Sequence, residues 1–255
     1  MNKVTVILAI VCLSTAAALP EQQRIAGGAV ATLAQHPYTA AVLYASNNVN
    51  FLPICGGAII NNRSILTAIY CWSKTGVHSN QFRARTGSVN STSGGVLHNI
   101  AQIISHPNYN SWNHDNNIGI LRVSTIIAFS TSVRPVPIAG SNYNLADYQF
   151  VWAIGWGRTT VNSVVSEQLR RVEIRTINQG RCSEIYGVSF VTPNMICAGW
   201  PTTGRGSCVA DTGSPLLHNN VAVGVTSFSI GCGDVNFPPI YTRISRYTTW
   251  IQANA

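Results

Sequence analysis

Hydrophobic and polar positions alternate with a period of two in several short segments of the chain. Between residues 171 and 175, valine and isoleucine alternate with arginine and glutamate, and three valines recur at every second position between 221 and 225. This spacing is typical of half-buried β-strands. Paired glycines or asparagines, as at 94–95 and 219–220, separate the segments and indicate turns. The pattern predicts an all-β fold, either a sandwich or a barrel.

Two segments depart from this pattern. Apolar residues at 244, 247, 250 and 251 recur at helical spacing, which predicts a short C-terminal helix over 244–255. A segment with two prolines, 133–137, divides the chain into halves, and we interpret it as the link between two β units.

The first eighteen residues have one lysine, an apolar stretch from 4 to 13 and small residues from 14 to 18. This order is typical of a secretory signal peptide and is too short for a membrane span. Its removal takes Cys12 with it and leaves six cysteines. Six cysteines in a secreted chain indicate three disulfides, although the spacing alone leaves their pairing open.

The net charge is +8, but the basic residues are scattered along the chain and form no run longer than the pair at 170–171. We therefore expect neither nucleic-acid binding nor attachment to a membrane surface. Fourteen of the sixteen basic residues are arginine, which keeps its charge at alkaline pH better than lysine does. No group of histidines, cysteines and carboxylates has metal-ligand spacing, so no metal or other cofactor is expected.

Several motifs resemble, in order, those of the trypsin-like serine proteases. They are RIAGG at 24–28, CGG at 55–57, LTAIYC at 66–71, DNNIGIL at 115–121, GWG at 155–157, CAG at 197–199 and CVADTGSPL at 208–216. The resemblance covers residues 25–255. Phrases such as SNYNLADYQ and SRYTTWI are similar to digestive trypsins of caterpillar midgut, which implies an insect protein of the gut lumen.

The resemblance implies a fold and a set of boundaries. It implies two six-stranded antiparallel β-barrels, about 25–133 and about 137–243, with a cleft between them and a helix at 244–255. A signal peptide, 1–18, and an activation propeptide, 19–24, would precede them. It also implies a monomer with three disulfides, Cys55–Cys71, Cys182–Cys197 and Cys208–Cys232.

The three catalytic positions of the family are all substituted. Tyr70 stands in place of the histidine, Asn117 in place of the aspartate and Thr212 in place of the serine. A phenol, with a reference pKa of about 10, is a poor base at neutral pH, and asparagine has no negative charge. Threonine keeps a hydroxyl but adds a methyl group and has fewer rotamers. We expect no other histidine to act as the base, since all six read as surface or turn residues: His36, His78, His98, His106, His114 and His218.

Other functional positions of the family are partly retained. Ala210 replaces the glycine whose N–H, with that of Thr212, would form the oxyanion hole. The activation residues are present, with Arg24 before the cleavage site, Ile25 after it and Asp211 as the partner of the new N-terminus. The specificity pocket would be neutral and narrowed, because its positions hold Gly206, Ser229 and Pro239. Two sequons, at Asn62 and Asn90, are candidate glycosylation sites.

An intact scaffold with a substituted triad predicts a secreted homologue without proteolytic activity. Such a protein would act by binding protease inhibitors, substrates or partners in a protease cascade. Two alternatives remain open. One is a weak or atypical endopeptidase of digestion that uses Thr212 with Tyr70 ionised in an alkaline lumen. The other is a structural or storage protein that uses only the stable barrels.

Overall fold

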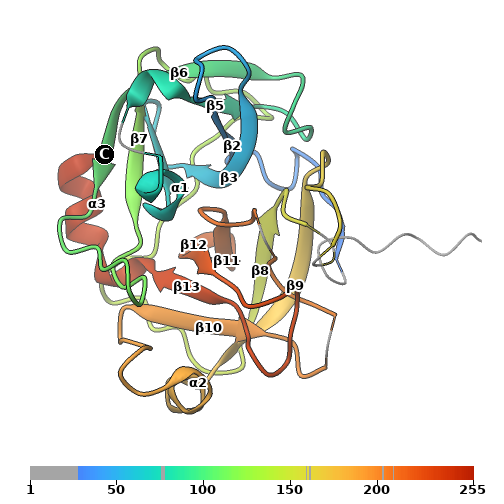
Figure 1. Cartoon of the computed structure of the whole chain (residues 1–255), viewed down its shortest axis with the longest axis vertical. Helices are drawn as coiled ribbons and strands as arrows, with labels where there is room; N and C mark the ends of the chain where they lie inside the picture. Colours follow the sequence, from blue (N-terminus) through green and yellow to red (C-terminus); the bar gives the residue numbers. More distant parts are fainter. Residues whose placement is uncertain (1–27, 76–77, 159, 161, 203, 209) are drawn as a thin grey trace, which may run out of the picture.

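The computed structural model describes residues 28–75, 78–158, 160, 162–202, 204–208 and 210–255. The expected signal peptide, the propeptide and the cleavage site with Arg24 and Ile25 lie outside these residues. No described helix is long and apolar enough to cross a membrane. Figure 1 shows two β-barrels, one above the other.

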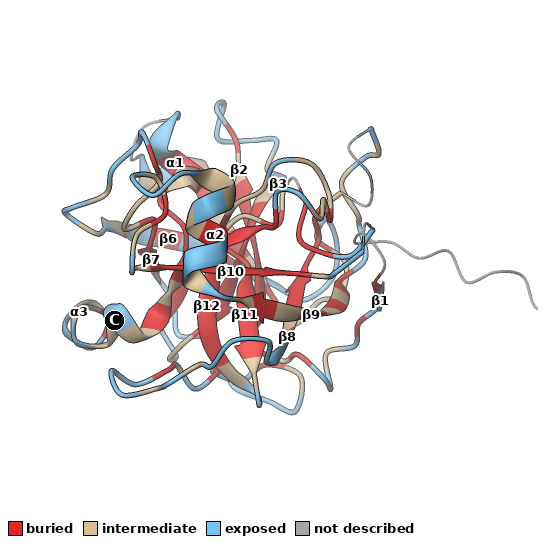
Figure 2. Cartoon of the chain, turned by 90° about the horizontal axis from the view of Figure 1, so that it is seen from below, coloured by how far each residue is buried: buried red, intermediate tan, exposed pale blue. Residues whose placement is uncertain are grey.

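The first barrel is closed and antiparallel, in the strand order β2-β3-β4-β7-β6-β5. Its interior is filled by fully buried apolar side chains such as Ile59, Phe82 and Leu121, and Figure 2 shows buried residues along the inner parts of the sheets. The strands are β2 (Thr39–Tyr44), β3 (Leu52–Ile59), β4 (Ser64–Thr67), β5 (Phe82–Thr86), β6 (Val96–Ser105) and β7 (Gly119–Val123).

The second barrel is also antiparallel and six-stranded. Its order is β9-β10-β13-β12-β11-β8, and a further pairing of β9 with β8 closes it. A short strand, β1 (Ala29–Val30), pairs with the start of β9. The strands are β8 (Phe150–Gly155), β9 (Arg170–Ile177), β10 (Met195–Gly199), β11 (Pro215–His218), β12 (Val221–Phe228) and β13 (Ile240–Arg243). The expected pair of six-stranded barrels is thus confirmed.

The predicted alternation is confirmed in β9, where buried and half-buried positions follow one another. It is wrong for β12, which is buried at every position from 222 to 227. Both faces of β12 are covered, because the connection between the barrels bonds to its start and Asn117 of the first barrel bonds to its end. Ala222 donates its N–H to Pro137 O, and Ser227 accepts a hydrogen bond from Asn117 in the first barrel.

The connection between the barrels, 124–149, is hydrogen-bonded to both of them. Val136 N–H donates to Ile59 O in the first barrel, and Ala139 N–H donates to Ala222 O in the second. The proline-containing segment 133–137 lies within this connection. It therefore runs along the junction of the two barrels and bonds to each.

The described part of the chain also forms the short α-helices α1 (Tyr70–Ser73), α2 (Gln179–Tyr186) and α3 (Thr248–Asn254), with 3₁₀ turns η1 (Ser79–Gln81) and η2 (Ile244–Arg246). The C-terminal helix is present but begins later than predicted. Tyr247, with φ −120° and ψ 7°, interrupts the helical backbone between η2 and α3. The helix α3 lies beside the first barrel (Figure 1), where Arg122 donates a hydrogen bond to Asn254 O.

All three expected disulfides are present. Cys55–Cys71 joins β3 to α1, and Cys182–Cys197 joins α2 to β10.

The two asparagines of the sequons, Asn62 and Asn90, differ in their surroundings. Asn62 is exposed, whereas Asn90 is half-buried and its side-chain oxygen accepts hydrogen bonds from Thr92.

We predict that replacing Cys55 and Cys71 together by alanine lowers the free energy of unfolding by about 3 kcal/mol, because the link closes a loop of 16 residues. The double variant avoids a lone reactive thiol. Denaturant unfolding of both proteins measures the difference. An unchanged midpoint would show that packing alone holds α1 on β3.

Candidate active site

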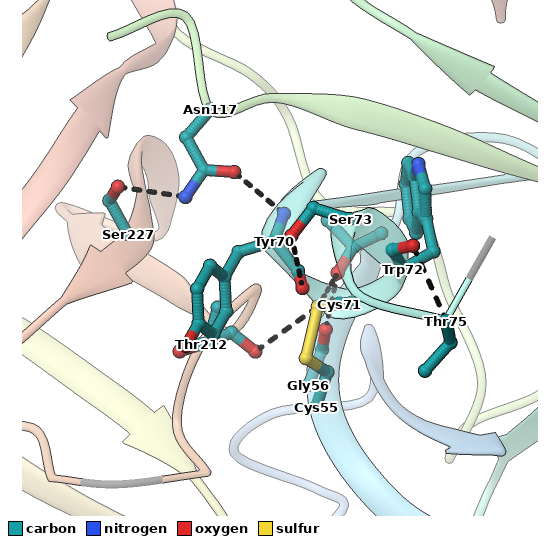
Figure 3. Close-up of a disulfide and its surroundings, with 11 residues drawn as sticks. Cys55, Gly56, Tyr70, Cys71, Trp72, Ser73, Thr75, Asn117, Thr212 and Ser227 are labelled. Carbon is teal, nitrogen blue, oxygen red and sulfur yellow. Dashed lines mark hydrogen bonds between the residues drawn. A yellow bond between two sulfur atoms is a disulfide. The ribbon is translucent and has the colours of Figure 1, made fainter. Parts of the chain in front are cut away.

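A cleft of about 380 Å³ opens where the two barrels meet. The first barrel contributes Tyr70, Lys74 and His114 to its walls, and the second contributes Ala210 and Thr212. The structure thus brings Tyr70 and Thr212 to one cleft, although 142 positions separate them in the chain. Figure 3 shows the Tyr70 ring directed from α1 toward the Thr212 segment.

Asn117 is fully buried directly behind Tyr70 and joins the two barrels. Its Oδ1 accepts the backbone N–H of Tyr70 at 3.0 Å, and its Nδ2 donates to Ser227 Oγ on β12 at 2.9 Å (Figure 3). Its backbone oxygen accepts a third bond, from Thr242 Oγ1 at 2.8 Å. A carboxamide can donate and accept at once, so Asn117 satisfies both neighbours without placing a charge in the core. It fixes the backbone of Tyr70 and not its phenol.

The Thr212 loop is held against the first barrel by its backbone. Thr212 O accepts the N–H of Gly56 at 2.9 Å. The next residue, Gly213, has φ +84°, and a Cβ there would lie 2.1 Å from Thr67 Oγ1. Glycine is required at this position because the loop approaches β4 too closely for any side chain. This contact places the half-buried Thr212 side chain at the cleft.

The backbone at Ala210 suits the binding of an oxyanion. Ala210 has φ +73°, a left-handed conformation that costs an alanine about 1 kcal/mol. Within the described part of the chain, the N–H groups of Ala210 and Thr212 donate to no protein acceptor. The substitution of glycine by alanine has therefore kept this left-handed turn, and two N–H donors remain available beside the Thr212 hydroxyl.

Lys74 and His114 also line the cleft beside Tyr70, and sequence reasoning identified neither of them as a site residue. The Nζ of Lys74 lies 5.1 Å from the centre of the Tyr70 ring. The His114 ring meets the same ring edge-on, with 5.3 Å between centroids. His114 has φ +57° and Asn116 has φ +56°, so the chain turns sharply before Asn117. The one sequence signal that could have identified His114 as a cleft residue is its position three residues before Asn117.

The expectation that all six histidines occupy the surface or turns is wrong for His98, which is buried on β6. His36 lies between two turns but is buried, and His114 lies in a sharp turn that lines the cleft. Each buried ring has one hydroxyl partner, Tyr38 for His36 and Thr86 for His98, while its second nitrogen has no hydrogen-bond partner among the described residues. His218 lies away from the cleft, as expected, and contacts Tyr143.

The residues expected at the specificity pocket are uncharged. Gly206 is buried, and a Cβ there would lie 3.2 Å from Gly233 and 3.4 Å from Pro239, so Gly206 and Pro239 are neighbours. Ser229 lines the cleft that contains Thr212. The neighbouring Phe228 ring packs against His114, with 5.2 Å between centroids. This end of the cleft is thus apolar or neutral.

Asp211 is buried beneath the Thr212 loop. Its two oxygens accept the N–H groups of Gly157 at 2.8 Å and Cys208 at 2.9 Å. Burial raises the pKa of Asp211 to about 6, and the two backbone hydrogen bonds lower it only in part. An ionised carboxylate here requires a cation for full stability.

Comparison with known proteins identifies close relatives. Residues 25–251 match the family described as Trypsin. The chain is 51% identical to "Trypsin CFT-1" of Choristoneura fumiferana, across 99% of this chain and 100% of that protein. It is 44% identical to "Trypsin, alkaline C" of Manduca sexta, across 98% of each. "Achelase-1" of Lonomia achelous is 43% identical, across 91% of this chain and 100% of its own.

These relatives contradict the expected protein without proteolytic activity. Proteins that are 44–51% identical over nearly the whole chain are named trypsins. The interpretation as a binding protein and not an enzyme was therefore wrong. That expectation rested on the joint loss of the three family side chains, whereas the structure keeps an open cleft with a hydroxyl and two N–H donors at Ala210 and Thr212. The alternative of an atypical digestive endopeptidase agrees better with the relatives.

We predict that Asn117→Ala lowers the free energy of unfolding by about 2–3 kcal/mol, because it leaves the Tyr70 N–H and Ser227 Oγ without their partner. Asn236→Ala, at an exposed position, is the matched control and should change it by less than about 0.5 kcal/mol. Urea unfolding measures both. Equal effects of the two substitutions would contradict the bridging role of Asn117.

A second prediction concerns Asp211 in a chain that is kept uncleaved by Arg24→Gln. The folded-state pKa, about 6, is above the ordinary value of 3.8. Stability from the protonated acid is therefore fully present below about pH 4 and is lost as the pH rises through about 6, by on the order of 3 kcal/mol. Thermal melts between about pH 4 and 8 should show this loss relative to Asp211→Asn. The two proteins differ only at residue 211, so parallel curves would refute the shift.

Proposed function

Because the chain belongs to the trypsin family, we propose that it is a secreted digestive endopeptidase with an atypical catalytic set that works at alkaline pH. The observation that carries the proposal is the Thr212 hydroxyl in the cleft between the barrels, beside N–H groups of Ala210 and Thr212 that donate to no described acceptor. In acyl transfer, a hydroxyl acts as the nucleophile and paired N–H donors stabilise the oxyanion that forms.

The reaction has two halves. Thr212 Oγ attacks the peptide carbonyl carbon while its proton passes to the ionised oxygen of Tyr70, and the N–H groups of Ala210 and Thr212 bind the oxyanion. The C–N bond then breaks, and the leaving amine takes the proton from Tyr70. Water hydrolyses the resulting threonyl ester by the same proton route, so that one water is consumed for each bond cleaved.

The proposed alkaline environment follows from the use of a tyrosine, Tyr70, as the base. Phenols have a reference pKa of about 10, so a tyrosine base works best at high pH. Fourteen arginines against two lysines keep the protein positively charged under those conditions. Relatives named alkaline trypsins from Manduca sexta support the same setting. A gut lumen is the compartment that we propose.

Substrate choice and activation follow from the remaining site residues. Gly206, Ser229 and Pro239 carry no charge, so the pocket is proposed to accept a neutral side chain before the cleaved bond. Activation is proposed to occur by cleavage after Arg24. The new ammonium of Ile25 would then supply the cation that buried Asp211 requires.

We predict that the protein cleaved after Arg24 hydrolyses peptides with neutral residues before the cleaved bond, with a rate that rises between about pH 7 and 11. Thr212→Ala should lower turnover by at least about 100-fold, whereas Thr212→Ser should keep or increase it. Both variants, made in the same host, control for contaminating proteases. Turnover that is equal in wild type and Thr212→Ala at every pH would refute the proposed function.

A further inference from the structure

Lys74 follows the short helix α1 and lies against the Tyr70 ring at the mouth of the cleft. Its Nζ is 5.1 Å from the ring centre, and both side chains line the cleft that contains Thr212. A hydrogen bond to the Tyr70 side chain, followed by the charge of Tyr70, raises the pKa of Lys74. Because Lys74 is exposed, its ammonium stays hydrated and charged. A positive charge therefore lies next to the phenol.

The other groups around Tyr70 supply no competing charge. His114 meets the ring edge-on, and burial followed by the Lys74 charge lowers its pKa, so it is neutral at alkaline pH. Tyr109 lies behind His114, with its hydroxyl 3.1 Å from His114 Nδ1. The pKa of Tyr109 is raised, and burial is the main cause. Among the described residues that line this part of the cleft, none is a carboxylate.

The neutral side chain of Asn117 is consistent with an anionic base. Asn117 accepts the backbone N–H of Tyr70, so a carboxylate there would add a negative charge on the Tyr70 side of the barrel junction. A nearby like charge disfavours ionisation of a phenol, whereas a nearby cation favours it. A histidine base is neutral and benefits from an anionic partner. A phenolate base instead requires a neutral group behind it and a cation beside it, which Asn117 and Lys74 supply.

We propose that Lys74 is a positioning residue that stabilises the phenolate form of Tyr70, and that Tyr70 is thereby the base that takes the proton from Thr212. This inference rests on the proposed function. Lys74 keeps its own proton throughout, and Tyr70 takes the proton from Thr212 and passes it to the leaving amine. The three substitutions at Tyr70, Asn117 and Thr212 then form one alternative catalytic set.

A spectroscopic titration tests the pair without relying on activity. The near-ultraviolet absorbance of tyrosinate is followed from about pH 7 to 11, and the Tyr70 contribution is obtained by subtracting Tyr70→Phe. In Lys74→Met this contribution should appear at higher pH than in wild type, and Lys74→Arg should restore it. Arg83→Met is the matched control, because Arg83 also lies over an aromatic ring, that of Phe51, outside the cleft.

The pH profile of peptide hydrolysis is the second readout. Lys74→Met should move the rising limb to higher pH and lower the rate at about pH 9 by roughly fivefold, while Arg83→Met leaves it unchanged. If the Tyr70 signal or the pH profile is the same in Lys74→Met and wild type, the role of Lys74 is overturned while the proposed endopeptidase stands. A Lys74-dependent Tyr70 signal without Thr212-dependent turnover overturns instead the proposed endopeptidase, and with it the role of Tyr70 as its base.

Discussion

The buried carboxamide of Asn117 is the interaction on which the site depends. It bonds to Tyr70 in the first barrel and Ser227 in the second, at the point where the cleft opens. The proposed base and nucleophile come from different barrels, so their separation is set by how the barrels pack. A second bond across the junction, from Gly56 N–H to Thr212 O, holds the nucleophile loop. The catalytic geometry is therefore a property of the barrel junction.

The charge balance of the cleft follows from the same junction. With a neutral bridge at Asn117, the ammonium of Lys74 is the one charged group among the described residues that line the cleft at Tyr70. In the familiar arrangement of a histidine and an aspartate, the charge lies on the bridge and the base is neutral. Here the negative charge is moved from the bridge to the base. Each substitution taken singly removes a catalytic function, whereas taken together they keep a hydroxyl, a basic group and a counter-charge.

Much of the fold could be predicted from the sequence, because its signals are local or belong to a colinear set of motifs. The alternation in β9, the C-terminal helix and the three disulfides were all found in this way. The burial of β12 was missed, since it depends on the connection at Pro137 and on Asn117, both distant in sequence. Lys74 was missed because its neighbour Tyr70 was judged by its type and not by its surroundings.

The inference from site to activity failed for a related reason. A motif comparison shows what a position lacks, and only three-dimensional contacts show what has taken its place. His114 illustrates this, because a left-handed backbone turns the chain just before Asn117 and its ring packs on Tyr70. Ala210 is a second case, since it keeps a conformation that glycine would adopt more easily.

The most direct test of the account is covalent labelling of Thr212. The cleaved protein is treated at alkaline pH with a serine-directed phosphonylating reagent, and the adduct is located by peptide mass spectrometry. The account predicts one adduct per chain, on the Thr212 hydroxyl, that forms faster as the pH rises and is lost in Tyr70→Phe. No adduct at Thr212 at any pH, or labelling that is independent of Tyr70, would contradict it.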